Sequence, residues 1–154
     1  MDSIIIFCAQ YLYLIIGFIA GIYWLTLPKK QKLRMVLFGI IAMATAFAMA
    51  KFAGMFYFDP RPFVTQNIAP LFPHVADNGF PSDHTLLTAT IAVIIYSASK
   101  KLGLVLMAMA IIVGLSRILA HVHSPIDIVG SLAFAVASGL LAYYLTNKLI
   151  SKFA

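Results

Sequence analysis

One short segment combines the residue types that nucleophilic chemistry requires. Ser116-Arg117 is followed by His123 and, four residues later, by Asp127. A carboxylate so placed can orient an imidazole and raise its basicity, as a nucleophilic histidine requires. Arg117 adds a planar fork of N–H donors that suits phosphoryl oxygens. The segment therefore favours chemistry on a phosphate group.

A second segment, Pro81-Ser82-Asp83-His84, stands where an apolar stretch begins. The first turn of a helix offers free backbone N–H groups and the positive end of the helix dipole, which together form an anion site. The structural alternative is capping of the helix by Ser82 or Asp83, with His84 as an interfacial residue.

A third group consists of Lys51 and the pair Arg61-Pro62. Lys51 precedes Asp59 by eight residues, which is about 12 Å of helix. A lysine at that depth in a membrane is costly unless it is paired, faces a cavity or snorkels to the interface. Snorkelling of Lys51 and simple exposure of Arg61 in a loop are the structural alternatives.

Asp127 has two further interpretations. Ser124-Pro125-Ile126-Asp127 reads as a capping box with proline at the first helical position. His121-x-His123 with Asp127 would be a metal site, although the nearby basic residues would oppose a cation. For His121 alone, packing or an interfacial hydrogen bond is the expected role.

Composition places these residues in a membrane protein. The chain has 154 residues, 62% hydrophobic and only 10% charged, with a mean hydropathy of +0.97, too apolar for a soluble domain of this size. A spanning helix needs roughly 20 apolar residues. Five such stretches occur, at residues 4–27, 35–58, 82–99, 102–120 and 125–146. We predict one all-α domain over residues 1–154, a polytopic bundle of about five transmembrane helices.

The basic residues predict an orientation. The net charge of +6 comes without a basic groove of interleaved aromatics, which argues against nucleic acid. Eight of the eleven basic residues stand in three clusters after the first, third and fifth stretches: Lys29, Lys30, Lys32, Arg34, Lys100, Lys101, Lys148 and Lys152. Since such clusters mark the cytoplasmic side, we expect the N-terminus outside and the C-terminus inside. Lys51, Arg61 and Arg117 then lie toward the outer face.

The long connection between the second and third stretches holds five of the seven prolines. They are Pro60, Pro62, Pro70, Pro73 and Pro81. This density disfavours regular helix and predicts an ordered, irregular loop. A connection of over twenty residues in a compact domain indicates a functional loop.

Together the three groups resemble the signatures of the type-2 phosphatidic acid phosphatase superfamily. Ser116-Arg117, five residues, His123, three residues and Asp127 match its third signature. The second is usually Pro-Ser-Gly-His, and Asp83 replaces its glycine. The first usually has six residues between Lys and Arg-Pro, whereas nine separate Lys51 from Arg61.

The resemblance implies a mechanism without metal or cofactor. His123 would attack phosphorus and form a phosphohistidine, oriented by Asp127. His84 would protonate the leaving oxygen and then activate water. The phosphoryl oxygens would be held by Lys51, Arg61, Ser82 and Arg117, and Asp83 would keep the backbone N–H of the usual glycine while adding a carboxylate.

Within the superfamily, the compact form and the stretch Asp59-Pro-Arg-Pro-Phe63 look most like bacterial undecaprenyl-diphosphate phosphatases of the bacitracin-resistance type. This implies a cytoplasmic-membrane enzyme that recycles the lipid carrier of cell-wall synthesis, with a lipid diphosphate as its substrate. Two alternatives stay open. One is a phosphatidylglycerophosphate, phosphatidate or lipid A phosphatase, and the other is a non-catalytic membrane subunit that binds anionic lipid.

Overall fold

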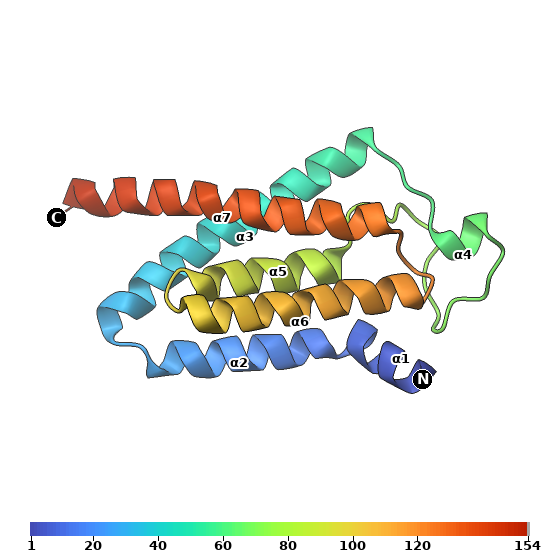
Figure 1. Cartoon of the computed structure of the whole chain (residues 1–154). Helices are drawn as coiled ribbons and strands as arrows, with labels where there is room; N and C mark the ends of the chain where they lie inside the picture. The colour runs from blue at the N-terminus through green and yellow to red at the C-terminus, as the bar shows by residue number, and fades with distance from the viewer. Residues whose placement is uncertain (154) are drawn as a thin grey trace.

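The computed structural model describes residues 1–153, apart from the side chains at positions 150, 152 and 153, and its regular elements are all helices. Ala154 lies outside the described residues. In chain order the helices are α1 (Asp2–Gln10), α2 (Leu12–Thr26), α3 (Lys29–Phe56), α4 (Pro62–Thr65), α5 (Asp83–Tyr96), α6 (Lys100–Leu119) and α7 (Pro125–Phe153). Figure 1 shows α2, α5, α6 and α7 side by side along one direction, with α3 crossing them obliquely.

The helices account for the predicted membrane spans. Three of them, α3, α6 and α7, are long and apolar enough to cross a membrane, and the bent pair α1 and α2 makes up to four. The fifth predicted stretch is α5, a shorter apolar helix of 14 residues. The all-α prediction is confirmed, and about five spans is consistent with this count. The second span begins earlier than predicted, because α3 continues through the basic cluster back to Lys29.

The first predicted span is not one straight helix. It breaks at Tyr11, where α1 and α2 meet at 47°. Beside the break, the carbonyl of Ala9 accepts a hydrogen bond of 3.1 Å from Nη1 of Arg117. A side chain inserted into the backbone hydrogen-bond ladder is a recognised cause of a kink. Because this donor comes from α6, the bend could not be read from the first stretch alone.

The short helix α5 lies in the interior of the bundle, against α6, α7, α3 and α2. Small residues allow this close packing. A Cβ added to Gly103 would lie 2.4 Å from Cα of Tyr96, and one added to Gly139 would lie 2.2 Å from a methyl carbon of Val93. The buried threonines of α5 are satisfied locally, as when the hydroxyl of Thr90 donates to the carbonyl of Leu86 at 2.7 Å.

The loop after α3 is ordered around one amide side chain. Asn78 donates to the carbonyls of Gly54 (3.2 Å) and Tyr57 (2.9 Å). It accepts from the backbone N–H groups of Asp59 (2.9 Å) and Phe80 (3.0 Å). The prediction of an ordered loop therefore fits, with one correction: the four-residue helix α4 forms inside it, because Pro62 stands at the start of that helix, where proline is tolerated.

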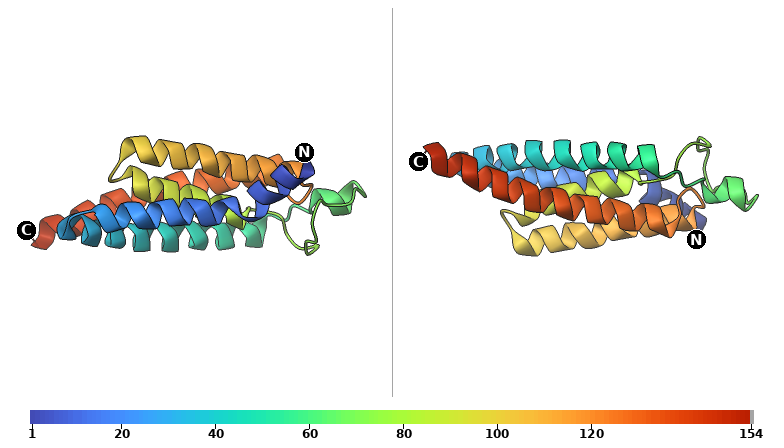
Figure 2. Two further views of the ribbon diagram at one scale, coloured as in Figure 1. Left: turned by 90° about the horizontal axis from the view of Figure 1, so that it is seen from below. Right: turned by 90° about the horizontal axis from the view of Figure 1, so that it is seen from above.

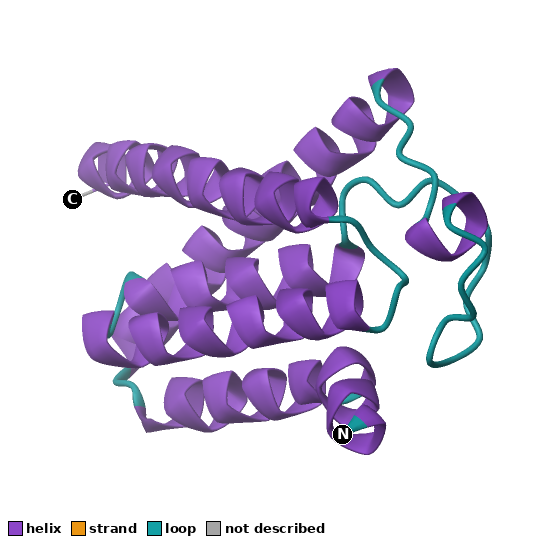
Figure 3. Ribbon diagram, turned by 45° about the vertical axis from the view of Figure 1, so that its right-hand side comes forward, coloured by secondary structure: helices purple, strands orange, loops and turns teal. Residues whose placement is uncertain are grey.

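The two ends of the bundle differ in what they carry. The long loop, α4 and the N-terminus lie at one end, shown in both views of Figure 2. The α2–α3 and α5–α6 turns and the end of α7 lie at the other (Figure 1). Figure 3 shows that nearly all the irregular backbone gathers at the loop end. The three basic clusters of the sequence therefore share the end away from the loop.

Candidate active site

The predicted site residues other than Lys51 come together at the loop end of the bundle. There the start of α5, the end of α6 and the start of α7 meet under the long loop. The starts of α5 and α7 are bonded to each other, since Ser82 N donates to the carbonyl of Asp127 at 3.3 Å. The hydroxyl of Ser131 bridges them by donating to the carbonyls of Ser82 (2.9 Å) and Asp127 (2.7 Å).

His123 and Asp127 form a buried pair. Nδ1 of His123 lies 3.0 Å from Oδ2 of Asp127, and the two side chains are 3% and 0% exposed. Since Nδ1 faces a carboxylate, the hydrogen-bond network assigns the proton to Nδ1 and leaves a lone pair on Nε2. This is the tautomer that a nucleophilic histidine needs.

The same carboxylate oxygen also caps α7. Oδ2 of Asp127 accepts the backbone N–H of Ser124 at 2.9 Å, which is one half of the predicted capping box. The other half is absent, because the hydroxyl of Ser124 pairs instead with Asp59 in a short hydrogen bond. Oδ2 of Asp127 therefore makes both the capping contact with Ser124 and the contact with His123.

Gly79 makes room for this carboxylate. A Cβ at position 79 would lie 2.8 Å from Oδ2 of Asp127 and 3.1 Å from the carbonyl of Asp59. Any larger residue would displace the pair, so the loop approaches the start of α7 closely only because this position is glycine.

Arg61 reaches into the site from the loop and is 6% exposed. Its Nη1 donates to the carbonyl of Val122 at 2.7 Å and lies 3.2 Å from Nε2 of His123. Its Nε forms an ion pair of 2.7 Å with Asp77, whose side chain is 58% exposed. Arg61 thus stands directly at the unprotonated nitrogen of His123.

Arg117 approaches from α6 and is 3% exposed. Its Nη1 donates to the carbonyl of Ala9, and its Nη2 lies 2.9 Å from Nε2 of His74. Its Nε is buried and has no hydrogen-bond partner among the described residues. The rings of His74 and His123 are 6.1 Å apart. The guanidinium groups of Arg61 and Arg117 and the rings of His74 and His123 therefore lie close together. Among them, the N–H of Arg117 Nε is available as a hydrogen-bond donor.

This environment holds the loop histidines neutral. Burial, and then the charges of Arg117 and Arg61, lower the pKa of His123 from 6.5 to about 2. Burial also lowers the pKa of His74, assisted by Arg61 and then Arg117. Burial acts to raise the pKa of Asp77, but the hydrogen bond and charge of Arg61 outweigh it and hold that pKa below 3.8. With the histidines neutral, positive charge in the site comes from Arg61 and Arg117, and Arg117 forms no ion pair with any residue that the structure describes, which suits an anion.

The residues at the start of α5 lie at this end as predicted. Ser82 is fully buried, and its Oγ accepts from the hydroxyl of Thr85 at 3.1 Å. No side-chain hydrogen bond caps α5, so simple capping does not explain Ser82 or Asp83, and the side chain of Asp83 is exposed. The ring of His84 is half-buried and packs edge-on against Tyr13 at 5.1 Å.

Lys51 is the predicted residue that the structure does not bring into the cluster. It is exposed on α3, and no hydrogen bond or ion pair joins it to another residue that the structure describes. Its predicted role stays a prediction. Ser116 is buried in α6 beside Arg117, and Pro62 begins α4 at the edge of the site.

The metal alternative involves His121. This residue has left-handed backbone geometry, with φ of 62°, and its carbonyl accepts from Phe63 N at 3.2 Å. Within residues 1–153, no group of three His, Cys, Asp or Glu side chains is arranged to hold a metal ion.

Three residues of the site escaped the sequence analysis: His74, Asp77 and Gly79. All belong to the proline-rich loop, and none falls in a signature. The available signal was the length of that loop, together with two polar side chains, His74 and Asp77, in an otherwise apolar stretch. Their partners, Arg117 and Arg61, could not be assigned without the fold.

Comparison with known proteins identifies a family and several relatives of this chain. The PAP2 superfamily model matches residues 33–151. The bacitracin transport permease protein BcrC of Bacillus licheniformis is 34% identical over 97% of this chain and 73% of its own length. Undecaprenyl-diphosphatase BcrC of Bacillus subtilis is 32% identical over 97% of this chain and 77% of its own length. The crystal structure of Aquifex aeolicus LpxE superposes with a TM-score of 0.69 at 22% identity, covering 94% of this chain and 87% of that one.

The lowered pKa of His123 predicts how stability depends on pH. Below 6.5 the unfolded chain takes up a proton on this histidine, whereas the folded chain does not until about pH 2. The contribution of this histidine to the free energy of unfolding is therefore largest above pH 6.5, and it falls as the pH is lowered. Between pH 7 and pH 5 we expect a loss of roughly 2 kcal/mol from this group. Unfolding of the purified protein in detergent measures it, and His123→Gln should have the smaller loss. Equal losses would contradict the neutral, buried histidine.

Proposed function

Because this chain belongs to the PAP2 superfamily, we propose that it is an undecaprenyl-diphosphate phosphatase, which releases inorganic phosphate from the lipid diphosphate in the membrane. The Bacillus subtilis relative named for this activity aligns with nearly the whole chain. The apolar helices are long enough to place the protein in a membrane, where such a lipid substrate is located. Removal of one phosphate would return the carrier lipid of cell-wall synthesis to its monophosphate form.

One observation carries the proposal: Nδ1 of His123 is held by Asp127, so that Nε2 presents its lone pair beside Arg61. A histidine fixed in this way is a nucleophile, and the buried arginines supply the positive charge that a phosphoryl group requires. This combination favours phosphoryl transfer over a structural role for the histidine.

The reaction proceeds in two steps. Nε2 of His123 attacks the terminal phosphorus, the bond from that phosphorus to the bridging oxygen breaks, and undecaprenyl phosphate leaves, with His84 as the proton donor. Water then attacks the phosphohistidine, gives its proton to His84 and breaks the N–P bond. Inorganic phosphate and neutral His123 result. Asp127 stabilises the positive charge that the imidazole carries in between.

The phosphate holders must exchange partners when substrate binds. Arg61 leaves Asp77, whose carboxylate is 58% exposed and can be taken up by water when the pair opens. Arg117 offers the N–H that has no partner in the free site. Ser82 and the N–H groups at the start of α5, where Asp83 stands, complete the anion site. The role of Lys51 would require its exposed side chain to turn toward these groups.

The substrate is tested by measuring phosphate release from several lipids. The purified protein in EDTA should hydrolyse undecaprenyl diphosphate faster than phosphatidylglycerophosphate, phosphatidate or lipid A, and vanadate should inhibit it as a mimic of the pentacoordinate phosphoryl group. Faster turnover of another lipid would reassign the substrate. Activity that is lost in EDTA and restored by one divalent ion would favour the metal alternative at His121 and His123. Lipid binding without any phosphate release would indicate a non-catalytic subunit.

The proposal includes an orientation in the bacterial cytoplasmic membrane. Since the three basic clusters share the end away from the site, the rule that basic loops stay in the cytoplasm puts the site at the outer face. The N-terminus then also lies outside, and the C-terminus lies inside.

Cysteine labelling in intact cells checks this orientation. In a Cys8→Ser background, Gln66→Cys in the exposed loop should react with an impermeant thiol reagent. The matched variant Lys101→Cys, exposed at the opposite end, should react only after the membrane is ruptured. The reverse pattern would place the site in the cytoplasm.

Substitution of Asp127 separates catalysis from capping. Asp127→Asn keeps an oxygen for the N–H of Ser124 but removes the negative charge from His123. We expect a rate loss of roughly a thousandfold or more, by analogy with serine-protease triads, and little change in the unfolding temperature. His123→Ala should form no phosphoenzyme, and any phosphoenzyme trapped in His84→Ala should sit on His123. Near-normal turnover of Asp127→Asn would mean that the carboxylate only caps a helix.

A further inference from the structure

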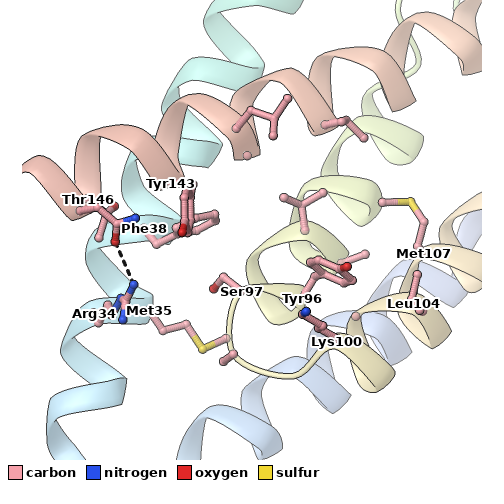
Figure 4. Close-up of a pocket in the computed structure, with 18 of the residues that line it drawn as sticks. Arg34, Met35, Phe38, Tyr96, Ser97, Lys100, Leu104, Met107, Tyr143 and Thr146 are labelled. Carbon is pink, nitrogen blue, oxygen red and sulfur yellow. Dashed lines mark hydrogen bonds between the residues drawn. The ribbon is translucent and has the colours of Figure 1, made fainter.

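A second cavity lies at the end of the bundle away from the active site. It has a volume of about 610 Å³ and opens between α3, α5, α6 and α7. Figure 4 shows side chains from these helices around it. It forms because α5 ends at Tyr96 while α3 and α7 continue past it, and because α6 makes few contacts with α7. Its volume is within the usual range of ligand pockets, roughly 300 to 1,000 Å³.

The cavity has apolar walls and a basic rim. Met35, Phe38, Val93 and Met107 supply apolar wall, whereas Arg34 and Lys100 bring positive charge. Arg34 donates through one guanidinium nitrogen to Oδ1 of Asn147 at 2.9 Å.

No acidic residue of the sequence neutralises this rim. The chain has five acidic residues and all are aspartates, in α1, in the long loop and at the starts of α5 and α7: Asp2, Asp59, Asp77, Asp83 and Asp127. All of these segments are at the active-site end (Figure 1). The charged side chains of the sequence at the cavity end are therefore all basic, which favours an anionic occupant.

A buried hydroxyl group in the lining also lacks a partner. Thr146 is 1% exposed, and its Oγ makes no hydrogen bond with any residue that the structure describes. It lines the cavity next to Asn147. The hydroxyl is itself covered, so an occupant reaches it only when the Thr146 side chain rotates, and a hydrogen bond made in that way would remove the cost of an unsatisfied buried hydroxyl. This observation points to a ligand independently of the charges.

We propose that the cavity binds an anionic phospholipid from the leaflet opposite the active site. Its phosphate pairs with Arg34 and Lys100, its glycerol or ester oxygens bond to Thr146, and one acyl chain lies along the apolar walls. Basic residues at a membrane surface attract anionic lipids. The proposal goes beyond the phosphatase activity and does not depend on its substrate.

The cavity is distinct from the place where phosphate is hydrolysed. Along α5, Tyr96 is about 18 Å from His84, and along α7, Thr146 is about 28 Å from Asp127. A headgroup on Arg34 therefore cannot reach His123. Such a lipid would instead stabilise the contact of α3 and α7 with the α5–α6 turn.

Lipid binding to the purified full-length protein tests the proposal. Phosphatidylglycerol and phosphatidylcholine with the same acyl chains are added to the protein in mild detergent, and affinity is measured by native mass spectrometry and by the rise in unfolding temperature. Phosphatidylglycerol should bind more tightly. The double variant Arg34→Gln, Lys100→Gln should weaken it roughly tenfold or more, whereas phosphatidylcholine binding should change little.

Two further variants distinguish this site from general surface charge. Lys29→Gln, Lys101→Gln removes the same charge at the same end from residues outside the cavity, and should retain most of the affinity. Thr146→Val keeps the shape and removes the unsatisfied hydroxyl. Without lipid it should be at least as stable as the natural chain, and it should gain less stability from phosphatidylglycerol.

Three results would overturn the proposal. The two double variants could lose affinity equally, which would indicate unspecific attraction to the basic end. Both lipids could bind equally well, which would indicate an apolar groove without headgroup recognition. Undecaprenyl phosphate could displace phosphatidylglycerol, which would assign the cavity to the substrate or product.

Discussion

The site depends on one atom, Oδ2 of Asp127. It accepts from Nδ1 of His123 and from the backbone N–H of Ser124, so it holds the histidine and starts α7 at once. Because the carboxylate is fully buried, both bonds form in a medium of low dielectric, where charge-assisted hydrogen bonds are strong. The start of a long membrane helix thereby becomes a rigid support for a side chain that must present one nitrogen in one direction.

Two buried arginines determine the shape of the surrounding backbone. Arg61 draws the loop onto the site through Val122 and Asp77, and Arg117 takes the carbonyl of Ala9 from the first helix. Burying a guanidinium group is costly unless its donors find acceptors, and both groups find them in distant backbone or loop groups, although Nε of Arg117 has none among the described residues. The bend at Tyr11 and the path of the loop therefore go together with the acceptors that these two guanidinium groups find.

Charge is also sorted along the length of the molecule. The aspartates and histidines gather with Arg61 and Arg117 at one end, and most lysines lie at the other. At the active-site end, positive and negative groups pair and orient each other. At the other end positive charge is left uncompensated, where lipid headgroups rather than side chains are the available partners.

The sequence by itself determined the helices and the signature residues. Apolar stretches of spanning length predicted α3, α6 and α7, and the spacing of Arg117, His123 and Asp127 predicted the residues of the candidate site, because both are local patterns. It did not reveal the bend at Tyr11, the pairing of His74 with Arg117 or the exposure of Lys51. These depend on which side chains meet across the bundle. Only the tertiary structure decided them, because the burial of a charge obliges distant backbone and loop groups to satisfy it.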